Sequence, residues 1–163
     1  MSSRALRLAF GALWAATLAG VALAHTGLRL RNVPAPHDAL FPSVRTVQEL
    51  ATHNALVSLW PLALVAIGWP ALIGVRLVGD ALIAAQLLGH GLVVGSTLGE
   101  RPELWRFLPH LPVEWLAIAL PAAAWITARR RPVRRGSLLG VLVLTCAALV
   151  GAAAIETYLT PIP

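Results

Sequence analysis

The stretch FLPHLPVEW, residues 107 to 115, places a histidine and a glutamate at the start of a long apolar run. His110 and Glu114 are four residues apart, so in a helix their side chains lie on one face, about one turn from each other. Imidazole and carboxylate groups bind zinc, and they also form hydrogen bonds between helices. The sequence has no HExxH pair, GxSxG turn or phosphate-binding loop. It therefore favours a protein without enzymatic activity but leaves that question open.

The composition indicates that these residues belong to a membrane protein. The chain has 163 residues, of which 58% are hydrophobic and 12% are charged, whereas a soluble domain has about 25% charged residues. Its formal charge of +6 comes from 13 arginines without any lysine. In a membrane protein such an excess sets the orientation, so we do not expect nucleic acid as a partner. Cys146 is the single cysteine, which excludes an internal disulfide.

Five apolar stretches are long enough, or nearly so, for the roughly 20 residues that a spanning helix needs. They lie at about 7–26, 50–69, 75–97, 108–128 and 137–158. We therefore predict one all-α domain over residues 1–163, a polytopic membrane bundle of about five transmembrane helices. Pro61, Pro70 and Pro121 should bend or break their helices, and a neighbouring helix must then satisfy any freed carbonyl. The first stretch could be a signal peptide cleaved after Ala24, but the length of its apolar run favours a retained helix.

The spacing of small and charged residues gives two predictions about packing. Small residues recur every four positions in the first and last spans, a pattern that lets helices approach closely in lipid. They are Gly11, Ala15 and Ala19, and Ala148 and Ala152. Arg76 and Asp80 are also four residues apart, so we predict that they pair with each other.

The arginines are distributed unevenly between the two sides of a five-span bundle. Eight fall on one side, namely Arg4, Arg7, Arg76 and the five arginines of RRRPVRR, residues 129–135. The other five are Arg29, Arg31, Arg45, Arg101 and Arg106. The positive-inside rule then predicts a cell-membrane protein with a cytoplasmic N-terminus and an extracytoplasmic C-terminus. We interpret the arginine run as an orientation anchor, with recognition of anionic lipid headgroups as the alternative.

In this orientation, polar residues of four spans reach similar depths towards the outer side. They are Asn54, His90, His110, Glu114 and Glu156, with His53 beside Asn54. Polar residues inside a span are costly unless they find partners, so we predict one shared polar cluster. Its use stays open between three hypotheses. The cluster could be a hydrogen-bonded lock between helices, a transport path or proton relay, or a site for zinc or another divalent metal. The expected metal ligands are His110, Glu114 and Glu156, together with His53 or His90.

The order of motifs resembles the stage II sporulation protein M family of small five-helix membrane proteins. The resemblance covers about residues 49–161. It is carried by Asn54, Gly91 and Gly95 in GHGLVVG, Pro109-His110 and Glu114 in LPHLPVEWLAIALP, and AAIETYLTP near the end. It implies a membrane scaffold for peptidoglycan-remodelling partners in the envelope, without established enzymatic activity, and it leaves a homo-oligomer open. His90 and His53 stand where the family commonly has asparagine, a departure that favours metal binding here.

Overall fold

The structure is a computed structural model that describes residues 2–27 and 43–159. Every regular element in these two ranges is a helix, which confirms the predicted all-α class. The α-helices are α1 (Ser3–His25), α2 (Val44–Ser58), α3 (Trp60–Ala66), α4 (Ile73–Glu100), α5 (Leu111–Ala128) and α6 (Arg135–Leu159). Two short 3-10 helices, η2 (Trp69–Ala71) and η3 (Pro102–Phe107), lie before α4 and before α5.

Four of these helices, α1, α4, α5 and α6, are long and apolar enough to cross a membrane. The helix predicted over 50–69 is divided, because α2 ends at Ser58 and α3 begins at Trp60. The expected break near Pro61 is thus confirmed, and Pro70 lies in the short helix η2 before α4. No break occurs at Pro121, because α5 continues through it from Leu111 to Ala128. With 15 residues in α2 and 7 in α3, neither segment reaches the roughly 20 residues of a spanning helix by itself.

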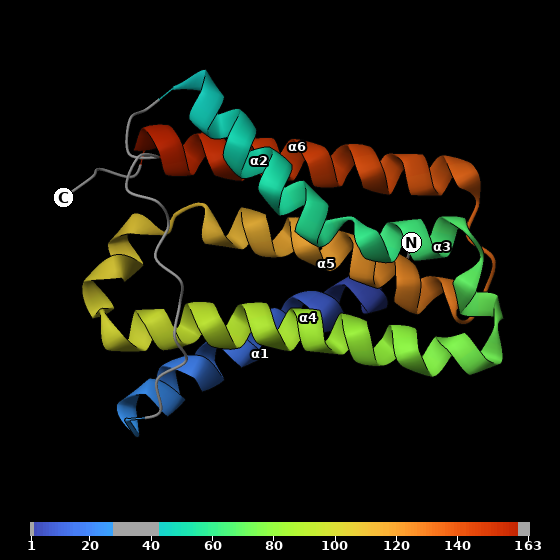
Figure 1. Ribbon diagram of the computed structural model, residues 1–163, viewed down its shortest axis with the longest axis horizontal. Coiled ribbons are helices and arrows are strands. Elements are labelled where there is room, and N and C mark those ends of the chain that lie inside the picture. Colours follow the sequence, from blue (N-terminus) through green and yellow to red (C-terminus); the bar gives the residue numbers. More distant parts are fainter. Residues whose placement is uncertain (1, 28–42, 160–163) are drawn as a thin grey trace.

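The described helices run along the bundle in alternating directions, with α2 and α3 following one another in the same direction (Figure 1). At one end Ser2, which precedes α1, donates a 3.3 Å hydrogen bond from its backbone N–H to Thr127 near the end of α5. The turn between α3 and α4 lines a pocket at the same end, together with residues 128–133. We name it the arginine end, after Arg4, Arg76, Arg129, Arg130 and Arg131, which line pockets there. The opposite end carries the turn η3 between α4 and α5 (Figure 1).

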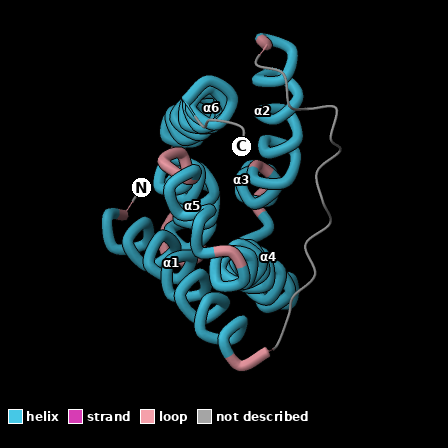
Figure 2. The backbone as a smooth tube through the Cα atoms, turned by 90° about the vertical axis from the view of Figure 1, so that its left-hand side faces the viewer, coloured by secondary structure: helices cyan, strands magenta, loops and turns pink. Residues whose placement is uncertain are grey.

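Helix α5 lies in the middle of the bundle, with α6 on one side and α1, α3 and α4 around the rest (Figure 2). Its indole rings Trp115 and Trp125 are each 1% exposed. Many of the other buried residues of α5 are alanines, and Ala117, Ala119 and Ala123 are each 0% exposed. Small side chains let the neighbouring backbones approach closely, which matters in lipid, where apolar contact alone drives little association.

Glycines of α4 bring this helix directly against α1. A Cβ atom on Gly91 would lie 2.7 Å from the Leu13 carbonyl oxygen, and one on Gly95 would overlap the backbone of Thr17. The stripe predicted for close packing in α1 is not the one used, because Gly11, Ala15 and Ala19 are exposed. Thr17 and Gly20 are instead buried on the face towards α4. In α6, Ala152 is buried and Ala148 is half-buried, as the spacing suggests.

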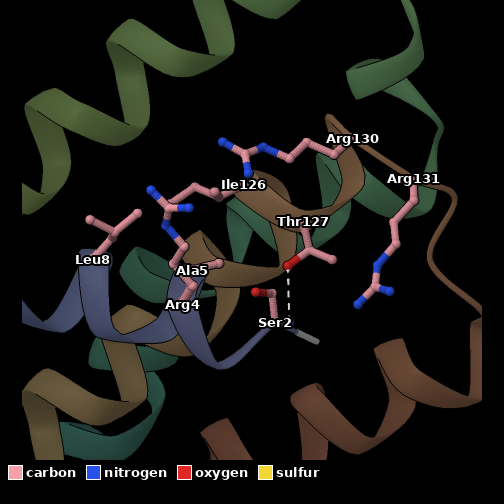
Figure 3. Close-up of a pocket in the computed structure, with 8 residues that line it drawn as sticks. All are labelled: Ser2, Arg4, Ala5, Leu8, Ile126, Thr127, Arg130 and Arg131. Atoms are coloured by element: carbon pink, nitrogen blue, oxygen red, sulfur yellow. Dashed lines mark hydrogen bonds between the residues drawn. The ribbon is translucent and has the colours of Figure 1, made fainter.

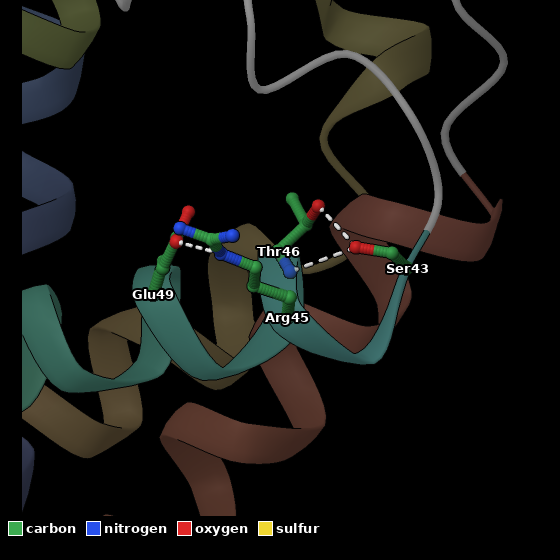
Figure 4. Close-up of polar contacts among 4 residues, drawn as sticks. All are labelled: Ser43, Arg45, Thr46 and Glu49. Carbon is green, nitrogen blue, oxygen red and sulfur yellow. Dashed lines mark hydrogen bonds and ion pairs between the residues drawn. The ribbon is translucent and has the colours of Figure 1, made fainter.

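The start of α2 is fixed by its own side chains (Figure 4). The Ser43 hydroxyl accepts a 3.1 Å hydrogen bond from the backbone N–H of Thr46, which satisfies one of the free amide groups of the first turn. One turn later, Arg45 and Glu49 form an exposed ion pair at 2.8 Å. Such a pair contributes little to stability, so the Ser43 cap is the feature that sets the helix boundary.

Candidate functional site

The predicted polar cluster has its centre where α2 meets α5. The Asn54 side-chain amide of α2 donates a 3.4 Å hydrogen bond to a carboxylate oxygen of Glu114 on α5. Both side chains are half-buried. The two residues are 60 positions apart in the chain, so this contact links two passes of the bundle through their polar groups.

A second carboxyl group lies on α6 within electrostatic range of Glu114. Glu156, also half-buried, interacts electrostatically with Glu114. Two carboxylates at close range repel each other when both carry charge. Of the five residues predicted for the cluster, the structure thus joins Asn54 to Glu114 by a hydrogen bond and places Glu156 within electrostatic range of Glu114.

His110 immediately precedes the apolar segment Leu111–Ala128 and begins the first turn of α5. The Glu114 backbone N–H donates to the His110 carbonyl at 3.0 Å, so the two residues are one helical turn apart, as their spacing predicts. The imidazole is 5% exposed, and its Nδ1 atom has no hydrogen-bond partner. Burial lowers the pKa of His110, which favours the neutral ring. Internal hydrogen bonding therefore leaves this buried nitrogen unexplained.

The remaining histidines have other surroundings. His90 is half-buried, and its Nδ1 atom contacts the Gln86 carbonyl oxygen of its own helix at 2.9 Å. Gln86 in turn donates from its side-chain amide to the Val57 carbonyl of α2 at 2.8 Å. His53, which was predicted as a metal ligand, is exposed on α2. Neither histidine forms a hydrogen bond with Glu114 or Glu156 like the one that Asn54 forms with Glu114.

The metal hypothesis requires at least three ligating side chains in one place. Among residues 2–27 and 43–159, no group of three or more His, Cys, Asp or Glu side chains is arranged to hold a metal ion. The four predicted ligands His110, Glu114, Glu156 and His53 thus do not form such a group. The arrangement supports hydrogen bonding between helices more directly than metal coordination.

Near the arginine end, Asp80 of α4 has partners that differ from the prediction. Its carboxylate accepts a 2.8 Å hydrogen bond from the Trp125 indole N–H and lies 3.2 Å from the Arg129 guanidinium. The predicted pair with Arg76 is wrong. Arg76 donates instead to the Pro70 carbonyl at 3.0 Å, because the turn before α4 brings that oxygen within reach.

The second buried tryptophan of α5 also has a partner on another helix. The Trp115 indole N–H donates a 3.2 Å hydrogen bond to the Thr17 hydroxyl, which joins α5 to α1.

Neither tryptophan contact was predicted from the sequence. The signal for them was present, since an indole has one N–H donor and usually finds an acceptor when it is buried. Which acceptor it finds depends on the neighbouring helix, and helical periodicity does not identify that helix.

Comparisons with protein-family models, with curated proteins and with solved structures find no match for the chain. The resemblance to the stage II sporulation protein M family therefore stays a prediction from the sequence motifs.

Proposed function

We propose that the protein is a multi-pass scaffold of the cell membrane, which holds protein partners of the envelope in place. Peptidoglycan-remodelling enzymes are the partner class expected from the resemblance. The N-terminus and the arginine end face the cytoplasm in this proposal, and the C-terminus lies outside the cell. The alternating directions of the described helices and the excess of arginine at one end support that orientation.

The observation that carries the proposal is how α5 is attached to its neighbours. Side-chain hydrogen bonds join it to α1 through Trp115, to α2 through Glu114 and to α4 through Trp125. Alternating-access transport requires one part of a bundle to move against another around a binding site. A central helix bonded to three different neighbours opposes such movement. It suits a protein that keeps a fixed shape while other proteins bind to it.

The residues that carry the family resemblance support the same function. Asn54 and Glu114 bond to each other across two helices, and Gly91 and Gly95 allow the close contact of α4 with α1. These motif residues thus have roles in holding the bundle together. A scaffold needs such residues, and it needs no catalytic group.

Crosslinking in native membranes tests the scaffold. The tagged full-length protein is expected to recover the same envelope protein in repeated experiments, and Glu114→Gln is expected to recover it too, since glutamine can still accept from Asn54. A folded wild-type protein that recovers no recurrent envelope partner would reject the proposal. A folded Glu114→Gln variant that keeps its partner but loses cellular activity would assign a chemical role to the carboxylate.

One observation favours a second candidate, a metal-binding membrane enzyme or transporter that uses His110, Glu114 and Glu156. It is the buried, unpaired Nδ1 atom of His110, one turn from a glutamate that interacts with a second glutamate. Elemental analysis of detergent-purified protein, without affinity histidines or chelator, decides between the two. Zinc in near-stoichiometric amount, lost in His110→Ala and in Glu114→Gln, would replace the scaffold with a metal-dependent function. Metal-free, folded protein would leave the helix lock as the use of the cluster.

A further inference from the structure

A pocket at the arginine end combines positive charge with an apolar wall (Figure 3). Its charged lining comes from the start of α1 and from the connection between α5 and α6. The lining residues are Ser2, Arg4, Ala5, Leu8, Ile126, Thr127, Arg130 and Arg131. Two segments more than 100 positions apart in the chain thus form one binding surface, held together by the Ser2–Thr127 hydrogen bond.

The positive charge of this pocket is not compensated by the protein. The structure pairs Arg129 with Asp80, but among the described residues it gives Arg4, Arg130 and Arg131 no ion pair. All three are exposed, and the lining contains no carboxylate. In Figure 3 the guanidinium groups of Arg4 and Arg130 lie beside Ile126, whereas that of Arg131 extends away on the other side of Thr127. Guanidinium groups present a planar set of donors that matches the oxygens of a phosphate.

The apolar wall identifies the kind of phosphate that the pocket would bind. Leu8 lies one turn after Arg4 on α1 and is 55% exposed. Ile126 stands opposite it on α5, within a segment long and apolar enough to span a membrane. A soluble phosphate would contact the arginines and leave Leu8 uncovered. A phospholipid would place its headgroup on the arginines and an acyl chain along Leu8 and Ile126.

We propose that this pocket is a binding site for an anionic phospholipid, whose phosphate is held by Arg4 and Arg130. The site lies where the arginines meet the beginning of the apolar spans, which is the depth of the headgroups. Basic pockets between transmembrane helices bind anionic headgroups in this way. The proposal is independent of the scaffold function, because it rests on residues at the opposite end of the bundle from the polar cluster.

Native mass spectrometry of the full-length protein in neutral detergent tests the site, with phosphatidylglycerol and phosphatidylcholine as the probes. Phosphatidylglycerol is expected to bind in preference to phosphatidylcholine. The double variant Arg4→Gln/Arg130→Gln should weaken that binding about 30-fold, at about 1 kcal/mol for each arginine. The matched control is Arg134→Gln/Arg135→Gln, which removes the same charge from the same end but outside the pocket lining. It should bind as the wild type does.

Two outcomes of this titration would overturn the proposal. Equal weakening in the pocket variant and in the control would mean that the arginines act only through their general charge. Equal binding of the two lipids by the wild type would mean that no anionic headgroup is recognised. Circular dichroism of each variant verifies the fold, and exposed arginines can be replaced without disturbing the packing.

A second measurement distinguishes a lipid from a free phosphate. Leu8→Ser should weaken phosphatidylglycerol about 3- to 10-fold, because it removes apolar contact with the acyl chain, and inorganic phosphate should not displace the lipid. If Leu8→Ser has no effect and inorganic phosphate displaces phosphatidylglycerol, the pocket takes a soluble phosphate and the lipid site is rejected.

Discussion

The side-chain amide of Gln86 donates a 2.8 Å hydrogen bond to the backbone carbonyl oxygen of Val57. In an unbroken helix this oxygen would accept from the residue four positions later, which is Pro61 and has no N–H. An unpaired carbonyl within a bilayer costs several kcal/mol. One residue of α4 therefore compensates for the proline that divides α2 from α3.

The first prediction concerns this bond. Gln86→Leu should lower the free energy of unfolding by about 1–3 kcal/mol, since it leaves the Val57 carbonyl without a donor. In a Pro61→Ala background the loss should be smaller, because residue 61 then offers its own N–H to that oxygen. Denaturation in mixed detergent, followed by circular dichroism, measures all four proteins. Equal losses in both backgrounds would show that Gln86 acts for another reason.

The second prediction tests the contact between α1 and α4. Gly95→Ala should destabilise the protein by about 1–3 kcal/mol, because the new methyl group overlaps the Thr17 backbone. Gly89→Ala is the matched control on the same helix, since a Cβ there meets nothing within 4 Å. It should be neutral or raise stability by up to about 1 kcal/mol through helix propensity. Similar thermal stability of the two variants would contradict the packing described for α1 and α4.

The third prediction concerns the partner of Asp80. A double-mutant cycle between Asp80→Asn and Arg129→Gln should give a coupling of about 0.5–1 kcal/mol, a modest value because both side chains are partly exposed. The same cycle with Arg76→Gln should give a coupling near zero, since Arg76 bonds to the Pro70 carbonyl. Chemical denaturation provides the free energies. A larger coupling to Arg76 than to Arg129 would restore the pairing expected from the sequence.

The fourth prediction concerns the proposed orientation. In a Cys146→Ala background, Glu103→Cys should react with a membrane-impermeant maleimide in intact cells, because η3 lies at the end proposed to face outwards. Arg134→Cys should react only after the membrane is opened. Both positions are exposed in the structure, so access depends on the side of the membrane. The reverse pattern would place the arginine end outside and reject the orientation.

The class of the fold and the positions of its helices could be predicted from the sequence, because long apolar runs and prolines act locally. The pairing of helices could not. Gly11, Ala15 and Ala19 have the spacing of a packing face, yet they are exposed, whereas Gly95 contacts Thr17 across two helices. Spacing identifies a face that can pack closely, but the neighbour that covers it is a property of the whole bundle.

The candidate site divides in the same way. Asn54, Glu114 and Glu156 were identified as polar groups that need partners, since an unpaired polar group in a span is costly. The sequence alone determined that an all-α bundle carries these groups and collects arginine on one side. Only the tertiary structure decided that Asn54 bonds to Glu114, that Trp125 and Arg129 share Asp80, and that Arg4 meets Arg130 in one pocket. The physical reason is that hydropathy and residue spacing describe one helix at a time. A side-chain hydrogen bond between helices requires two segments far apart in the sequence to meet at the same depth with matching faces.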